Sequence, residues 1–259
     1  MMNYYEVVEK LDLDSLFVPI VSGTIELPFL IEQTRSPYGF PPAMIPLWLE
    51  DIDFVGFWHH WFTNDRIKSL VLQMPELDYV VIERARSIRQ LVIIYLYERL
   101  CSLGYVDSLA HIISSAIGFQ GVAKLFTIFT ANGPGLEHLL VLEEFNKNPP
   151  QSCTMSKNLN LTKEQLMSFT SFDFNELERA QFGSNVPEWF LSNDMEGTFL
   201  EFLKKKDYKS AWMTLNSSGW EFTQAKIAIL KLSEVAGCPR FKDFAESWAS
   251  LPHEAYGSY

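Results

Sequence analysis

Residues 36–62 read SPYGFPPAMIPLWLEDIDFVGFWHHWF, and the expected fold is built outward from this stretch. It holds four prolines, three of the seven tryptophans, a cluster of acidic residues and the only adjacent pair of histidines. Proline fixes φ and donates no backbone hydrogen bond, so the prolines exclude a regular helix here. Aromatic and β-branched residues favour strands. We therefore expect two short strands, at about 45–49 and 53–61, around an acidic turn.

The flanking segments extend this pattern. Residues 3–16 have the apolar spacing of a short amphipathic helix, and residues 16–33 are typical of extended structure. Residues 34–46 are expected to form a loop because of their prolines, and residues 66–74 a further strand. Together these segments predict a small, mostly antiparallel sheet of four or five strands.

The pattern becomes helical after Pro75. Residues 77–103 carry the apolar repeat of one long helix, which Gly104 would end. Residues 147–160, KNPPQSCTMSKNLN, have the composition of a linker. Further helices are expected at about 106–118, 120–131, 135–146, 173–181, 186–192, 194–205, 207–217, 219–236 and 240–250.

The predicted fold class is α+β, because strands and helices are segregated along the chain rather than alternating. A small, mostly antiparallel sheet in the N-terminal third precedes a predominantly α-helical remainder. We expect an α+β domain at 1–146 with early strands and covering helices, the linker at 147–160, and an all-helical domain or subdomain at 161–259.

Negative charge is concentrated at the start of the chain. The net charge of the 259 residues is −11. Residues 1–55 carry nine carboxylates and two cations, and so supply −7 of this total. Such a field repels nucleic-acid phosphates and anionic membranes and attracts basic partners. A solvated acidic face that only aids solubility is the alternative.

Cysteine usage and the N-terminal sequence indicate the compartment. Cys101, Cys153 and Cys238 are too distant from one another to predict a disulfide framework or a metal site. The N-terminal residues lack the charged and apolar regions of a signal peptide. The longest apolar run, residues 91–97, is too short to span a membrane. We expect a cytoplasmic protein without cofactors that binds neither nucleic acid nor membrane.

Two clusters of residues are candidate chemical sites. Neighbouring side chains on a strand point to opposite faces, so His59 and His60 cannot bind one metal ion from regular strand geometry. Asp51 and Asp53 share a face and could share a proton or hold a hard cation, although a turn of solvated acids is commoner. We assign no catalytic, cofactor-binding or metal-binding residue.

Three arginines at the start of the predicted long helix, Arg84, Arg86 and Arg89, leave two interpretations open. They could form an anion site, but exposed ion pairing along the helix, such as Glu83 with Arg86, is favoured.

The motif Pro46-Leu47-Trp48 followed by Gly56-Phe57-Trp58 resembles the SUKH-type immunity proteins of bacterial toxin systems. The resemblance covers residues 1–104. It implies an N-terminal helix, a proline-punctuated lead-in and aromatic strands on a small curved sheet that helices cover. It also implies a function, namely an inhibitor that neutralises a cognate toxin by direct binding. An acidic chain suits a basic toxin such as a nuclease.

If the protein binds a partner, acidic and aromatic residues of the opening stretch are the candidate contacts, since such residues dominate electrostatic steering and interface energetics. These candidates are Glu50, Asp51, Asp53, Trp58, His59, His60 and Trp61.

Two other functional classes stay open. The first is an intracellular scaffold or regulatory adaptor whose C-terminal helices dock other proteins. The second is a hydrolase that uses His59 or His60 together with Asp51 and Asp53.

Overall fold

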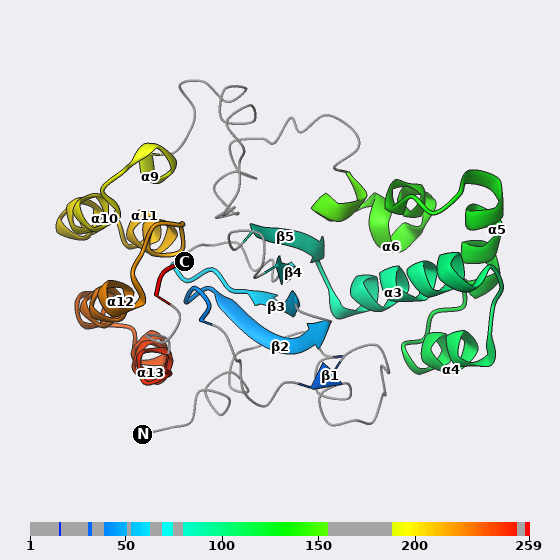
Figure 1. Ribbon diagram of the computed structural model, residues 1–259, viewed down its shortest axis with the longest axis horizontal. Helices are drawn as coiled ribbons and strands as arrows, with labels where there is room; N and C mark the ends of the chain where they lie inside the picture. The colour runs from blue at the N-terminus through cyan, green and yellow to red at the C-terminus, as the bar shows by residue number, and fades with distance from the viewer. Residues whose placement is uncertain are drawn as a thin grey trace.

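A five-stranded antiparallel sheet lies between two groups of helices in the computed structural model (Figure 1). The strands pair in chain order. They are β1 (Ile31–Glu32), β2 (Met44–Glu50), β3 (Asp53–Trp58), β4 (Ser69–Met74) and β5 (Val80–Ala85). The structure describes residues 16, 31–32, 39–50, 53–62, 69–74, 80–154, 188–252 and 257–259. The helices predicted at 3–16 and 173–181 lie outside these ranges.

Both groups of helices follow the sheet in the sequence, which confirms the α+β prediction. The first group comprises α3 (Ile88–Leu103), α4 (Ser108–Ala116), α5 (Val122–Asn132), η1 (Leu136–Val141), α6 (Glu143–Asn146) and η2 (Gln151–Cys153). The second comprises α9 (Glu188–Leu191), α10 (Met195–Lys204), α11 (Tyr208–Leu215), α12 (Phe222–Ala236) and α13 (Pro239–Ala249).

The hairpin of β2 and β3 forms the expected strand pair, with a bulge where proline interrupts it. Pro46 pairs with Gly56, but the next pair joins Trp48 to Val55, so Leu47 is the extra residue. A bulge tolerates proline, because the ladder of backbone hydrogen bonds is interrupted there and the missing N–H is not needed. Position 56 must be glycine, because a Cβ there would overlap the carbonyl oxygen of Ile45.

The prediction of one long helix at 77–103 is wrong for its first part. Residues 80–85 form β5 and pair with β4, and the helix α3 begins only at Ile88. Ser87 caps it by accepting a hydrogen bond from the backbone N–H of Gln90 at 3.1 Å. Pairing with β4 outweighs the local helical spacing here. The predicted end is confirmed, since Gly104 has a left-handed φ of 76°.

Residues after α5 also differ from the prediction. The helix expected at 135–146 is divided into η1 and α6, because Leu142 between them has an extended backbone. The described part of the expected linker lies against the sheet: Ser152 Oγ donates to the carbonyl of Arg84 at 2.7 Å, and Cys153 is buried. The division into domains at 1–146 and 161–259 stays a prediction.

The three arginines near β5 are held by internal acceptors. Arg84 donates to Glu98 at 2.7 Å, and Arg86 donates to the buried Glu83 at 2.8 Å. Arg89 donates to the carbonyl of Ile117 at 2.8 Å. The predicted contact of Glu83 with Arg86 therefore forms, although across a turn after a strand, and these contacts favour ion pairing over an anion site.

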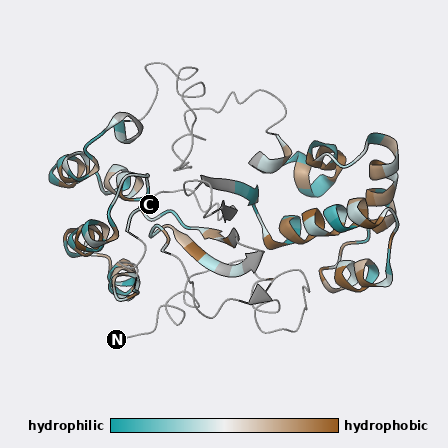
Figure 2. Cartoon of the chain, in the orientation of Figure 1, coloured by the Kyte–Doolittle hydropathy of each residue, from teal (hydrophilic) through white to brown (hydrophobic). Residues whose placement is uncertain are grey.

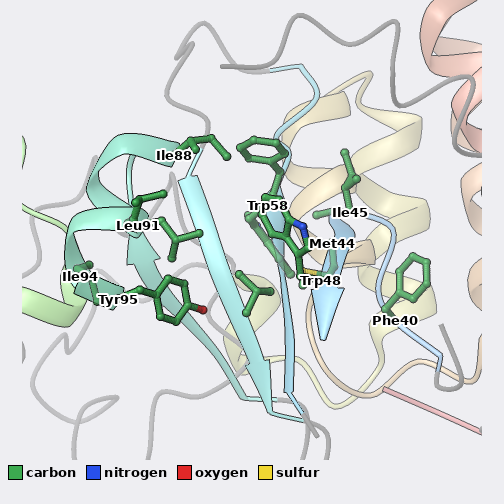
Figure 3. Packing of buried hydrophobic residues seen from close by; sticks show 14 of the residues in the cluster. Phe40, Met44, Ile45, Trp48, Trp58, Ile88, Leu91, Ile94 and Tyr95 are labelled. Carbon is green, nitrogen blue, oxygen red and sulfur yellow. The ribbon is translucent and has the colours of Figure 1, made fainter. Parts of the chain in front are cut away.

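The core joins the sheet to α3. Phe57 and Trp58 of β3 are buried together with Met44 and Ile45 of β2, and Figure 3 shows Trp58, Met44 and Ile45 close to one another in the packing. Residues 91–97 of α3 are all buried, whereas α12 buries one face. Figure 2 accordingly shows hydrophobic colouring along α3 and mixed colouring along α10 to α13.

Replacing Trp58 by alanine is expected to lower the free energy of unfolding by about 3–5 kcal/mol, because the side chain is only 2% exposed and leaves a cavity. Trp58→Phe keeps most of the apolar volume and should cost less. Ile227→Ala is the control, since Ile227 is 69% exposed. Urea unfolding measures all three. A loss below about 1 kcal/mol for Trp58→Ala would contradict its place in the core.

Candidate functional site

The hairpin of β2 and β3 carries all the predicted partner-binding residues, but at its two opposite ends. At one end Glu50 pairs with Asp53 across the two strands, and residues 51–52 connect them. Asp51 lies outside the described residues. We call Glu50, Asp51 and Asp53 the acidic hairpin end. The backbone register therefore places two acidic residues of this end at opposed positions of the two strands.

The other end, which we call the hairpin base, comprises Ala43 and residues 58–62. Met44 pairs with Trp58, and the backbone N–H of His59 donates to the carbonyl of Ala43 at 2.8 Å. The strand ends at Trp58, so the prediction of a strand to residue 61 is wrong. His59 and His60 are half-buried in the segment that follows, and the rings of His59 and Trp61 meet edge to face at 4.9 Å. Because His59 and His60 lie beyond the end of β3, the rule that neighbouring strand residues point to opposite faces does not apply to them.

The register keeps the histidines away from the acids. Five residue steps lie between Asp53 and Trp58, and at about 3.3 Å for each step they span about 16 Å. Acid–base chemistry needs hydrogen-bond contact or one bridging water. His59 and His60 follow Trp58 and are therefore too far from Asp53 to act with it. The structure therefore does not bring Asp53 together with the two histidines, and because Asp51 lies outside the described residues the hydrolase hypothesis stays a prediction.

Aromatic rings dock the hairpin base onto the C-terminal helices. The centroid of the Trp61 ring lies 5.2 Å from that of Phe241 and 5.6 Å from that of Phe244, both in α13. The ring of Phe62 contacts Phe241 at 4.9 Å and Tyr208 of α11 at 6.0 Å. Phe62 has a φ of 63°, a conformation that costs about 1 kcal/mol or more outside glycine and is held here by these contacts.

Two tryptophans predicted as partner anchors serve internal packing instead. Trp58 is 2% exposed, so its side chain offers no surface to a partner in this structure. Trp61 packs against α13, as described above. We therefore leave both out of the proposed interface. The aromatic richness of this stretch is used for the core and for docking the helices.

Asn216 is a site residue that sequence reasoning missed. It follows α11, is fully buried, and its Oδ1 accepts from the backbone N–H of Ala43 at 2.6 Å. Its Nδ2 donates to the carbonyl of Trp212 at 2.8 Å. The sequence around it, Asn216-Ser217-Ser218-Gly219, is a plain turn signal. No local pattern indicates a partner that is 173 residues away in the chain.

The cysteines are poor candidates for nucleophiles. Burial raises the pKa of the Cys153 thiol to about 11, and burial also raises the pKa of Cys101. Both side chains are therefore protonated at neutral pH, whereas the thiolate is the reactive form.

Two features are absent from the described ranges. Within these ranges, no group of three or more His, Cys, Asp or Glu residues could hold a metal ion. None of the helices in the same part of the chain combines the length and the apolar content needed to cross a membrane.

The fold defines an α+β protein with an acidic hairpin, and comparison with known proteins adds no closer assignment. No family model matches the chain, and neither does any curated protein or solved structure. The resemblance of Pro46-Leu47-Trp48 and Gly56-Phe57-Trp58 to SUKH-type immunity proteins stays a hypothesis that rests on those residues.

The docking of the hairpin base predicts energetic coupling between Trp61 and Phe244. In a double-mutant cycle with Trp61→Ala and Phe244→Ala, we expect a coupling energy of about 0.5–1.5 kcal/mol, since aromatic pairs contribute this much beyond area burial. Trp61→Ala combined with Leu139→Ala is the control, because η1 belongs to the other group of helices. Urea unfolding of the variants measures both cycles. Equal coupling in the two cycles would contradict the docking.

Proposed function

We propose that this is a non-enzymatic, cytoplasmic binding protein, a bacterial immunity protein that neutralises a basic toxin through its acidic hairpin end. The observation that carries the proposal is the register that sets Glu50 opposite Asp53, with Asp51 between them in the sequence. These residues belong to the first 55 residues, which supply −7 of the net charge of −11. The resemblance to SUKH-type proteins agrees with this class of function.

Repulsion within the acidic hairpin end gives a physical reason for binding a cation. The register sets Glu50 opposite Asp53, and carboxylates at opposed positions of two antiparallel strands generally repel each other. A lysine or arginine from a partner would remove that repulsion while it forms its own ion pairs. The same field would speed encounter with a basic surface and repel nucleic acid. A basic protein is therefore the favoured partner.

The opposite end of the hairpin is firmly supported, which suits a binding element. The strands β2 and β3 have β1 and β4 on their outer sides. At the hairpin base, Asn216 binds Ala43 and Trp61 packs against α13. A site on a supported strand pair loses little conformational entropy when a partner binds.

Neutralising the three acids tests the proposal. Glu50→Gln, Asp51→Asn and Asp53→Asn together should slow association with the purified toxin encoded beside the gene by about tenfold or more at low salt. The effect should shrink at high salt, because salt screens the field. The stability of the variant should be equal or higher, since the opposed charges are gone. Stopped-flow association rates and urea unfolding give the two readouts.

The matched control makes the same change in charge on the C-terminal helices. Glu196→Gln, Glu234→Gln and Asp243→Asn remove three exposed carboxylates there and should alter the association rate much less. The proposal fails if no complex forms with the toxin at low salt, or if both triple variants bind alike. Binding of another protein that survives the hairpin variant and is lost on Ile227→Ser would favour the helical adaptor.

A further inference from the structure

The C-terminal end of α11 is capped by buried side chains in addition to the backbone N–H groups of Asn216 and Ser217. A helix leaves its last four carbonyl groups without partners inside the helix. In α11 each of these carbonyls accepts a hydrogen bond from a different side chain, and all four donors are buried. The bonds run from Asn216 Nδ2 to Trp212 O (2.8 Å), from Ser217 Oγ to Met213 O (2.9 Å), from Trp220 Nε1 to Thr214 O (2.9 Å), and from Tyr259 Oη to Leu215 O (2.6 Å).

One of the four donors comes from a distant segment, residues 257–259, which we call the strap. The strap runs antiparallel to residues 219–222, with Ser258 opposite Glu221. The backbone N–H of Tyr259 donates to the carbonyl of Trp220 at 3.0 Å. The ring of Tyr259 is 4% exposed, and its centroid lies 4.9 Å from that of Phe222. The strap therefore covers the turn between α11 and α12 with both its backbone and its side chain.

The turn beneath the strap is also the part of the helices that holds the sheet. Asn216 caps α11 and at the same time accepts from the N–H of Ala43, whose carbonyl accepts from His59. The ring of Phe222, which the strap contacts, lies so close to Gly39 that a Cβ there would overlap it. The turn and the first residue of α12 thus contact the chain at two points just before β2, at Gly39 and at Ala43.

We propose that residues 257–259 form a releasable strap that holds the turn between α11 and α12 in the conformation that binds Ala43, so that releasing Tyr259 loosens the hairpin base. Withdrawal of the phenol leaves the carbonyl of Leu215 buried without its side-chain donor. A buried acceptor without a donor is costly, so the end of α11 rearranges and Asn216 moves with it. The proposal is independent of the function proposed above.

Hydrogen exchange of single amides tests the strap in the full chain. In Tyr259→Ala, exchange of the Ala43 amide is expected to accelerate by about tenfold or more, because local opening governs exchange. Amides of the inner strand β4, such as that of Val71, should keep their rates. Tyr259→Phe keeps the ring and loses the hydrogen bond, so it should give a smaller acceleration and is the variant safest for folding. Tyr105→Ala is the control, since Tyr105 is 58% exposed.

The possible outcomes separate the strap from simple destabilisation. Acceleration at Ala43 with unchanged exchange at Val71 supports the proposal. An unchanged rate at Ala43 in both Tyr259 variants overturns it. Equal acceleration at Ala43 and Val71 also overturns it, because the strap would then contribute only to global stability.

Alkaline pH provides a second readout. Burial raises the pKa of Tyr259 well above its ordinary value of about 10, and Leu215, Trp220 and Phe222, which contact it, carry no charge. The stabilisation is therefore complete below about pH 10 and is lost as the pH rises further. Tyr259→Phe should lose less stability than the wild type between neutral pH and this alkaline range. Burial raises the pKa of Tyr97 to about 12. Tyr97 is present in both proteins, so its contribution to the pH dependence of stability cancels in the comparison.

Discussion

The backbone of Ala43 is the point on which the arrangement of the sheet and the C-terminal helices depends. Its N–H donates to Asn216 and its carbonyl accepts from His59, so one residue closes the hairpin and joins it to α11. Ala43 is fully buried, and water cannot replace either bond. The rings of Trp61 and Phe62 add apolar contact beside these bonds. Hydrogen bonds thus set the position of the helices relative to the hairpin, and aromatic packing contributes buried apolar area.

The length of β3 keeps the acidic hairpin end apart from the hairpin base. The acidic end places Glu50 opposite Asp53, whereas the base makes internal contacts. Because the two ends are about 16 Å apart, charge at the acidic end does not disturb the aromatic contacts at the base. Histidines next to tryptophans and acids looked like one composite site in the linear sequence. The hairpin places them at two opposite ends, and contacts with the C-terminal helices support the base.

The elements that sequence reasoning predicted well are those with a strong local signal. The strands near 45–49 and 53–61 were indicated by aromatic residues bounded by proline and acidic residues, and the end of α3 by Gly104. The first part of the helix predicted at 77–103 failed, because Val80, Val81 and Ile82 fit both a helical spacing and a strand. Pairing with β4 selected the strand, and no window of the sequence contains that partner.

The residues alone were sufficient for the α+β class and for the position of the acidic turn, because composition and short-range spacing carry that information. Other features depend on contacts between distant segments. The separation of the acids from His59 and His60 follows from the register of β3. The role of Asn216 follows from a bond across 173 residues, and the cap of α11 from a tyrosine 44 residues beyond it. The described part of stretch 36–62 therefore contributes the β2–β3 hairpin to the sheet, and its acidic end stays a candidate surface for a partner.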